Sequence, residues 1–211
     1  MRTVVRSLAL LISVIAAGFA WGQATAPPVD LLQTLRAGGY VIVFRHGATH
    51  PDQADTDPWH PENIAKQRQL NDKGRMEAKM VGEVLRAARV PIGKSYSSQF
   101  HRAVETARLI GGKEPQTTPD VTEGGLVVSP NENNRRTQAL RVLLGAIPDP
   151  GTNTLIVTHK PNIIDALGKE WFEVKEGEAS VFKPDPNGKS VLIARIQIDE
   201  WAKAGRGAVA S

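Results

Sequence analysis

The chain has 211 residues, of which 26 are basic and 22 acidic, so its formal net charge is +4. Its content of 41% apolar and 23% charged residues is typical of a globular protein and excludes a disordered or fibrous one. The absence of cysteine excludes disulfide bonds, thiolate catalysis and cysteine-based metal sites. The sequence contains no run of lysine or arginine that would indicate binding to nucleic acid. Its small net charge is compatible with a local positive pocket for a small anionic substrate.

The N-terminal segment has the three parts of a secretory signal peptide. Two early arginines precede an apolar run over Leu8–Trp21, and small residues follow it, with Ala24 at a suitable cleavage position. The apolar run is shorter than the roughly 20 residues that a membrane-spanning helix requires. We therefore expect a cleaved signal peptide over residues 1–24 and a secreted or periplasmic domain over residues 25–211, without stable membrane insertion after cleavage. A retained anchor is the alternative, and the sequence does not indicate an oligomeric state.

Hydrophobic periodicity predicts alternating helices and strands along the rest of the chain. In chain order, we expect a helix with Asp30 as its N-cap, a strand over 40–44, a long loop over 49–71, a helix from 72 to just before 90, a strand over 94–97, helices over 98–111 and 131–145, and strands over 154–158, 178–183 and 191–198. Residues 202–211 are small and polar and are expected to be frayed. This alternation indicates a layered α/β/α sheet with the active site at the C-terminal ends of the strands.

The tripeptide Arg45-His46-Gly47 directly follows the apolar strand over residues 40–44. A histidine in this position is held rigidly at the sheet edge. Its imidazole can attack phosphorus when one ring nitrogen is unprotonated and the other is fixed by a hydrogen bond. Gly47 allows a phosphate to approach closely, and Arg45 offers a planar fork of donors for phosphoryl oxygens. The alternative is a structural histidine beside a surface arginine.

Two further segments carry residues that suit a phosphate site. Arg102 lies in the first turns of the helix expected from residue 98, and helix N-termini favour anions. His159 follows the strand over residues 154–158 and can donate to a phosphoryl oxygen in the transition state. Taken alone, each of these residues is more often structural.

Together, three segments resemble the histidine phosphatase superfamily, which has a phosphoglycerate-mutase-like fold: Arg45-His46-Gly47, Ser97–Ala107 and Val157-Thr158-His159. The resemblance covers roughly residues 29–200 and suggests an exported bacterial-type member. It implies a phosphomonoester hydrolase in which His46 becomes phosphorylated, while Arg45, Arg102 and His159 bind the phosphoryl group. It also implies that no metal or other cofactor is needed and that Thr49 contacts the phosphate.

The resemblance also implies a proton donor for the leaving alcohol. One branch of the superfamily has an aspartate directly after the second histidine, where this chain has Lys160, so the chain departs from that branch. The mutase-like branch has a glutamate between the second arginine and the second histidine, and Glu123 is the candidate for that role. Glu178 is the rival candidate. We count Gly47, Thr49, Lys160 and Glu178 among the residues expected to line the substrate site.

Three other interpretations remain open at this stage. His46 and His50, followed by the aspartates over residues 52–57, are compatible with a metal hydrolase, although Gly47 and Pro51 disfavour a helix that would place both histidines on one face. A module that binds a phosphorylated ligand without turnover would have the same pocket. A phosphoryl-transferring mutase would also share it. The acidic loop is expected to cover the cleft, and the substrate is expected to be a phosphorylated small molecule or glycan.

Overall fold

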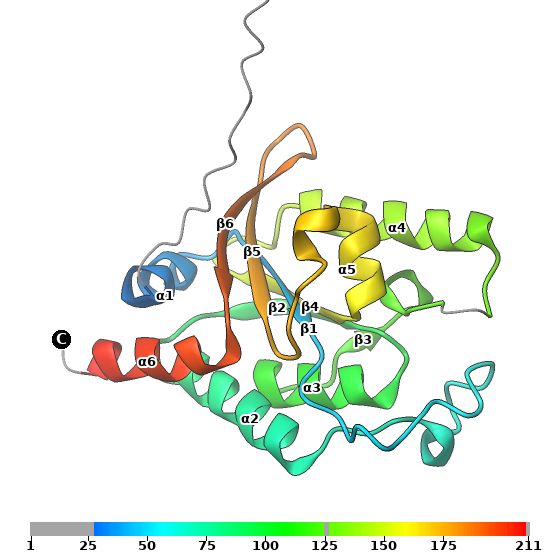
Figure 1. Cartoon of the computed structure of the whole chain (residues 1–211). Coiled ribbons are helices and arrows are strands. Elements are labelled where there is room, and N and C mark those ends of the chain that lie inside the picture. Colours follow the sequence, from blue (N-terminus) through cyan, green and yellow to red (C-terminus); the bar gives the residue numbers. More distant parts are fainter. Residues whose placement is uncertain (1–27, 125–126, 210–211) are drawn as a thin grey trace, which may run out of the picture.

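A mixed sheet lies at the centre of the part of the chain that the computed structural model describes, residues 28–124 and 127–209 (Figure 1). Its six strands have the order β3-β2-β4-β1-β5-β6. Neighbouring strands from β3 to β1 pair in parallel, whereas β5 and β6 are antiparallel. The strands are β1 Val41–Arg45, β2 Ile92–Ser97, β3 Gln116–Thr117, β4 Asn153–Thr158, β5 Ala179–Pro184 and β6 Ser190–Ile196.

Helices cover both faces of this sheet. They are α1 Pro28–Arg36, α2 Asp72–Ala87, α3 His101–Gly111, α4 Pro130–Gly145, α5 Lys160–Leu167 and α6 Ile198–Val209, and short 3₁₀ helices lie at Ile64–Lys66, Pro119–Val121 and Lys169–Trp171. One hydrophobic core lies between the sheet and α1, α2, α3 and α6, and a second lies between the sheet and α4 and α5 (Figure 1). The predicted layered α/β/α fold is therefore confirmed.

Strand β1 shows why the sequence favours this arrangement. Its apolar residues alternate between the two cores, with Ile42 and Phe44 in the first and Val41 and Val43 in the second. All four are at most 1% exposed. A strand buried on both faces needs apolar side chains at every position, which explains the continuous apolar run in the sequence.

The structure corrects the sequence-based prediction in four places. Residues 202–209, predicted to be frayed, belong to α6, and Trp201 in the same helix is 1% exposed and stacks on Phe44 with ring centroids 5.9 Å apart. Helix α5 and the short strand β3 were not predicted. Helix α1 begins at Pro28, so Asp30 lies inside it and is not its N-cap.

The predicted signal peptide over residues 1–24 lies outside the described residues. Within residues 28–124 and 127–209, no helix combines the length and the apolar character needed to cross a membrane.

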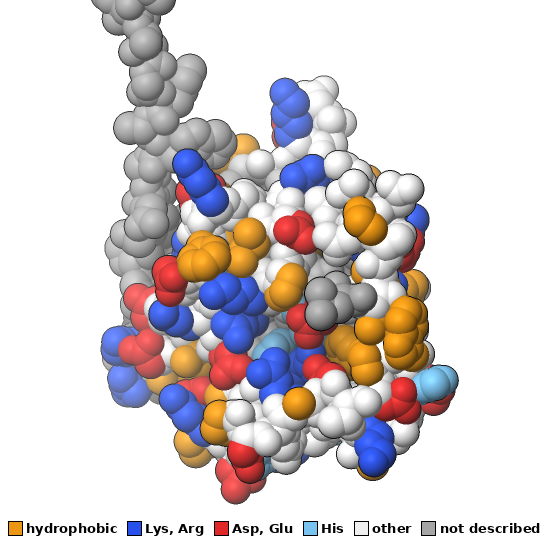
Figure 2. Space-filling model, turned by 45° about the vertical axis from the view of Figure 1, so that its right-hand side comes forward, with side chains coloured by type: hydrophobic (Ala, Val, Ile, Leu, Met, Phe, Trp, Pro, Cys, Tyr) orange, Lys and Arg blue, Asp and Glu red, His pale blue; other side chains and the backbone are white. Residues whose placement is uncertain are grey.

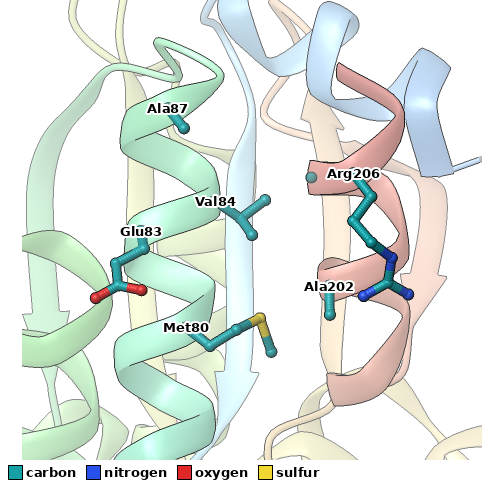
Figure 3. A pocket seen from close by; sticks show the side chains of 7 residues that line it. Met80, Glu83, Val84, Ala87, Ala202 and Arg206 are labelled. Carbon is teal, nitrogen blue, oxygen red and sulfur yellow. The ribbon is translucent and has the colours of Figure 1, made fainter. Parts of the chain in front are cut away.

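Helices α2 and α6 pack side by side over the first core and leave a groove between them (Figure 3). The groove is lined by Met80, Glu83, Val84, Ala87, Ala202, Gly205 and Arg206. A Cβ atom on Gly205 would lie 2.8 Å from a methyl group of Val84. Gly205, one of the small residues that suggested fraying, therefore permits the close approach of α6 to α2.

The parallel strands place several chain segments at one edge of the sheet. Arg45 at the end of β1 pairs with Thr158 at the end of β4, and Ser97 at the end of β2 pairs with Val157. The residues that come after these strand ends therefore meet. The long loop over residues 49–71 is closed by a bridge between Thr49 and Leu70 and leads directly into α2.

Candidate active site

Residues that directly follow three different strands converge at this sheet edge. His46 follows β1, Ser98 follows β2 and His159 follows β4. The imidazole rings of His46 and His159 have centroids 5.2 Å apart. Arg102, in the first turn of α3, has a side chain with no exposed surface. The structure thus brings together the strand-end histidines and Arg102 that the sequence singled out.

The hydrogen bond of the His46 ring determines which ring nitrogen is free. Its Nδ1 lies 2.9 Å from the carbonyl oxygen of Gly47. A carbonyl oxygen can only accept, so Nδ1 carries the hydrogen and Nε2 keeps a lone pair. Burial, followed by the nearby His159 and Arg102, lowers the pKa of His46 well below its ordinary value. The ring is therefore neutral near neutral pH, as a nitrogen nucleophile must be.

Arg102 is bound by carboxylates from two separate loops. Its Nη1 donates to Oδ1 of Asp55 at 2.9 Å, and its Nη2 donates to Oε1 of Glu123. Its guanidinium carbon also lies 4.6 Å from the ring centroid of Phe100. The loop over residues 49–71 therefore reaches this site through Asp55.

Arg45 directly precedes His46 in the sequence, and its contacts differ from those of Arg102. Its Nη1 donates to the carbonyl oxygen of Val174 at 2.8 Å, and its Nη2 lies 3.6 Å from Oε1 of Glu176. Burial is the main cause that lowers the pKa of Arg45, with Glu176 acting in the opposite direction. The same Oε1 of Glu176 accepts a hydrogen bond of 2.8 Å from Thr49. Glu176 thus joins Arg45 to Thr49.

His159 is completely buried between two polar neighbours. Its Nε2 lies 2.6 Å from Oγ of Ser98. Its Nδ1 lies 3.3 Å from Oε1 of Glu123, outside hydrogen-bonding geometry. Burial, followed by the positive charges of Arg102, Arg68 and Arg45, lowers the pKa of His159 well below its ordinary value. This histidine is therefore also neutral near neutral pH.

Three nitrogen atoms around His46 are buried and lack a hydrogen-bond acceptor among the residues that the structure describes. They are Nε of Arg45, Nε of Arg102 and Nδ1 of His159. A buried donor without an acceptor costs roughly 1–3 kcal/mol, and native proteins rarely leave such groups unpaired. Oxygen atoms of a bound anion would supply acceptors for such donors. Figure 2 shows histidine surface in a hollow on this face, bordered by basic and acidic side chains.

Gly47 and Lys160 were also expected to line the substrate site, and their contacts differ. Gly47 donates its N–H to the hydroxyl of Thr106 at 3.0 Å, and a Cβ on Gly47 would lie 3.1 Å from the backbone oxygen of Gly74, so the glycine also permits the contact with α2. Lys160 begins α5 and places its Nζ 4.7 Å from the ring centroid of Phe172.

Glu178 lies apart from the histidines in its contacts. Its side chain is 1% exposed, and both of its oxygens are occupied by donors. One oxygen accepts from Arg195 at 2.8 Å, and the other accepts from Gln197 at 2.7 Å and from the backbone N–H of Lys175 at 3.0 Å. Of the two candidate proton donors, the structure places only Glu123 in contact with the site arginine and histidine.

The sequence did not indicate a role at the phosphate site for Ser98, Asp55 or Glu176. Ser98 lies within the segment Ser97–Ala107 and directly follows a strand, which was its only signal. Asp55 and Glu176 reach the site from loops, through contacts that no local pattern encodes. Within the described ranges, no three histidine or acidic side chains are grouped so that they could hold a metal ion. Asp57 of the acidic loop contacts His60 at 2.7 Å.

Part of the chain matches a known protein family. Residues 41–128 match the family model described as histidine phosphatase superfamily (branch 1). No curated protein matches the sequence significantly.

Solved structures with a similar fold include three phosphatases. The protein histidine phosphatase SixA complexed with tungstate has 19% identity and a TM-score of 0.54 and covers 76% of this chain and 97% of its own. Phosphoserine phosphatase from Entamoeba histolytica in complex with 3-phosphoglyceric acid has 19% identity and a TM-score of 0.52, with coverages of 77% and 98%. A putative phosphohistidine phosphatase SixA from Nakamurella multipartitia has 17% identity and a TM-score of 0.53, with coverages of 75% and 95%. At these identities the likeness shows the fold.

The two buried histidines predict that acid destabilises the protein. The unfolded chain protonates His46 and His159 near the ordinary pKa of 6.5, whereas the folded chain holds both pKa values well below it and binds fewer protons. The free energy of unfolding is therefore greatest above that pH and decreases as the pH falls toward the folded-state values. Urea denaturation at a series of pH values from about 7.5 to about 5 should show this decrease.

The double variant His46→Asn, His159→Asn should reduce the slope of this decrease. The control is His60→Asn, because the hydrogen bond that His60 donates to Asp57 raises the pKa of His60, whose stabilising contribution is present at low pH and decreases as the pH rises. The control should keep the acid-side decrease. An unchanged slope in the double variant would contradict the assignment of neutral buried histidines.

Proposed function

We propose that this chain is a member of the histidine phosphatase superfamily that hydrolyses phosphate monoesters through a phosphohistidine on His46, without a metal ion. The observation that carries the proposal is the neutral His46 ring, whose Nε2 lone pair lies in a site with three buried, unpartnered donors. The nucleophile and the groups that would bind the phosphoryl oxygens are thus present together. The fold is shared with phosphatases, one of which is described with bound tungstate, an oxyanion.

The proposed reaction has two displacement steps. Nε2 of His46 attacks phosphorus, a nitrogen–phosphorus bond forms, and the phosphorus–oxygen bond to the leaving alcohol breaks. Arg45, Arg102 and His159 bind the phosphoryl oxygens and stabilise the charge of the transition state. Water then attacks the phosphohistidine, and inorganic phosphate and the neutral imidazole are released.

Glu123 is the proposed proton donor of the first step and the base of the second. Its Oε1 already contacts Arg102 and lies 3.3 Å from His159 Nδ1, so the carboxyl group lies beside the groups that would bind the phosphoryl oxygens. In the free protein Glu123 is the carboxylate partner of Arg102; once a phosphoryl group binds Arg102 in its place, Glu123 would take up a proton from solvent, donate it to the leaving oxygen and later accept a proton from the attacking water. The substrate class is proposed as a phosphorylated small molecule or glycan.

We predict that the protein hydrolyses an aryl phosphate such as p-nitrophenyl phosphate at the same rate with and without EDTA. His46→Ala should lower kcat on the order of 10⁴-fold or more, as loss of a nucleophile does. His50→Ala is the matched control and should remain active, whereas a metal site that includes both histidines would lose activity in either variant. Steady-state release of nitrophenol measures these rates.

Other outcomes would favour the competing functions. Activity that EDTA abolishes and zinc restores would contradict the metal-independent mechanism. Phosphate binding without turnover of any monoester would indicate a binding module. Transfer of the phosphoryl group to a second alcohol in preference to water would indicate a mutase.

We also predict that Glu123→Gln separates substrates by their leaving groups. An alkyl phosphate needs a proton on its leaving oxygen, so its hydrolysis should slow on the order of 10²–10⁴-fold, whereas p-nitrophenyl phosphate should change little. Glu178→Gln is the comparison, since Glu178 binds Arg195 and should affect stability and not leaving-group dependence. Equal slowing of both substrates by Glu123→Gln would remove Glu123 as the acid.

A further inference from the structure

Ser98 has a hydrogen-bonding position that the proposed reaction does not use directly. Its side chain is completely buried, at the end of β2 and just before α3. Its Oγ accepts a hydrogen bond of 3.1 Å from the backbone N–H of Phe100 and lies 2.6 Å from Nε2 of His159. The second distance is that of a strong hydrogen bond.

The direction of the bond between Ser98 and His159 can be derived from the available partners. A hydroxyl group has one hydrogen to donate, and within the described residues His159 Nε2 is the only acceptor in contact with the Ser98 hydroxyl. Ser98 therefore donates to Nε2, which must carry a lone pair. In a neutral imidazole the hydrogen then lies on Nδ1.

The environment of His159 Nδ1 supports the same assignment independently. Nδ1 lies 3.3 Å from a carboxylate oxygen of Glu123. A hydrogen on Nδ1 is attracted to that oxygen, whereas a lone pair on Nδ1 would be repelled by it. Nδ1 is also one of the three buried nitrogens without an acceptor, which is the arrangement expected of a donor that awaits a ligand oxygen.

We infer that Ser98 is a positioning residue that fixes His159 in the Nδ1–H tautomer and so makes it a hydrogen-bond donor toward the phosphoryl site. His46 and His159 then have the same tautomer but present opposite edges of their rings. His46 presents the Nε2 lone pair and His159 presents the Nδ1 hydrogen. The catalytic consequence of this inference rests on the proposed function, whereas the tautomer is a property of the folded protein alone.

Ser98 contacts His159, which in turn lies beside Glu123, as in a serine hydrolase triad, but the geometry assigns Ser98 a different role. Its side chain has no exposed surface, and its Oγ already accepts the N–H of Phe100. The ring of Phe100 packs edge-on against His159 at a centroid distance of 5.6 Å. Because its Oγ already accepts the N–H of Phe100, we assign Ser98 to orienting the histidine and not to nucleophilic attack.

Nitrogen NMR of histidine-labelled protein tests the tautomer directly. In wild-type protein near neutral pH, Nδ1 of His159 should give a protonated, pyrrole-type signal and Nε2 an unprotonated, pyridine-type signal, assigned by comparison with His159→Gln. In Ser98→Ala, the Nε2–H tautomer should become populated. Ser98→Thr keeps the hydroxyl and should restore the wild-type pattern. Ser97→Ala is the matched control, since the neighbouring buried hydroxyl donates to the Ser98 carbonyl and does not touch His159.

Kinetics with an aryl phosphate connect the tautomer to the reaction. Ser98→Ala should lower kcat on the order of 10–100-fold, the usual loss when an outer hydrogen-bond partner of a functional histidine is removed, with a smaller change in KM. A wild-type spectrum with the hydrogen on Nε2 would overturn the inference, as would labelling of Ser98 by a fluorophosphonate. The expected spectrum in a protein that hydrolyses no phosphate would refute the proposed function and leave the tautomer assignment intact.

Discussion

The buried charge of Arg102 is the constraint on which the rest of the site depends. A guanidinium without exposed surface is costly unless carboxylates and hydrogen bonds compensate it. Asp55 and Glu123 provide that compensation from two loops that lie far apart in the sequence. The ion pairs therefore organise the loops over residues 49–71 and around Glu123, and they attach both loops to the first turn of α3.

The same charge determines the state of the two histidines. Arg102 is among the causes that lower the pKa of His46 and of His159, after burial itself. Protonation of either ring would add a third positive charge to a dehydrated site that already contains Arg45 and Arg102. Both imidazoles therefore stay neutral in this site. Their hydrogen bonds then determine which nitrogen of each ring carries the hydrogen. The Gly47 carbonyl accepts the hydrogen on Nδ1 of His46, so Nε2 of that ring keeps its lone pair. The Ser98 hydroxyl donates to Nε2 of His159, so the hydrogen of that ring lies on Nδ1.

The sequence was sufficient where chemistry and fold depend on local pattern. The apolar runs before His46 and His159 predicted two buried strands, and parallel strands place the residues after their ends at one edge of the sheet, so the meeting of the histidines with Arg102 was predictable. Helix α6 was not, because its small residues suit its approach to α2 and Trp201 is held by a distant ring, Phe44. Asp55 and Glu176 were missed for a similar reason, since each acts through an arginine distant in sequence.

The position of the transferred phosphoryl group tests the central claim most directly. Wild-type protein is mixed with a labelled phosphate monoester, quenched rapidly in alkali, in which phosphohistidine survives, and digested for peptide mapping. We expect label on His46, whose Nε2 is free, and none on His159, whose Nε2 is bound by Ser98. Label on His159, or an acid-stable phosphoester on a serine or threonine, would contradict the assignment of His46 as the nucleophile.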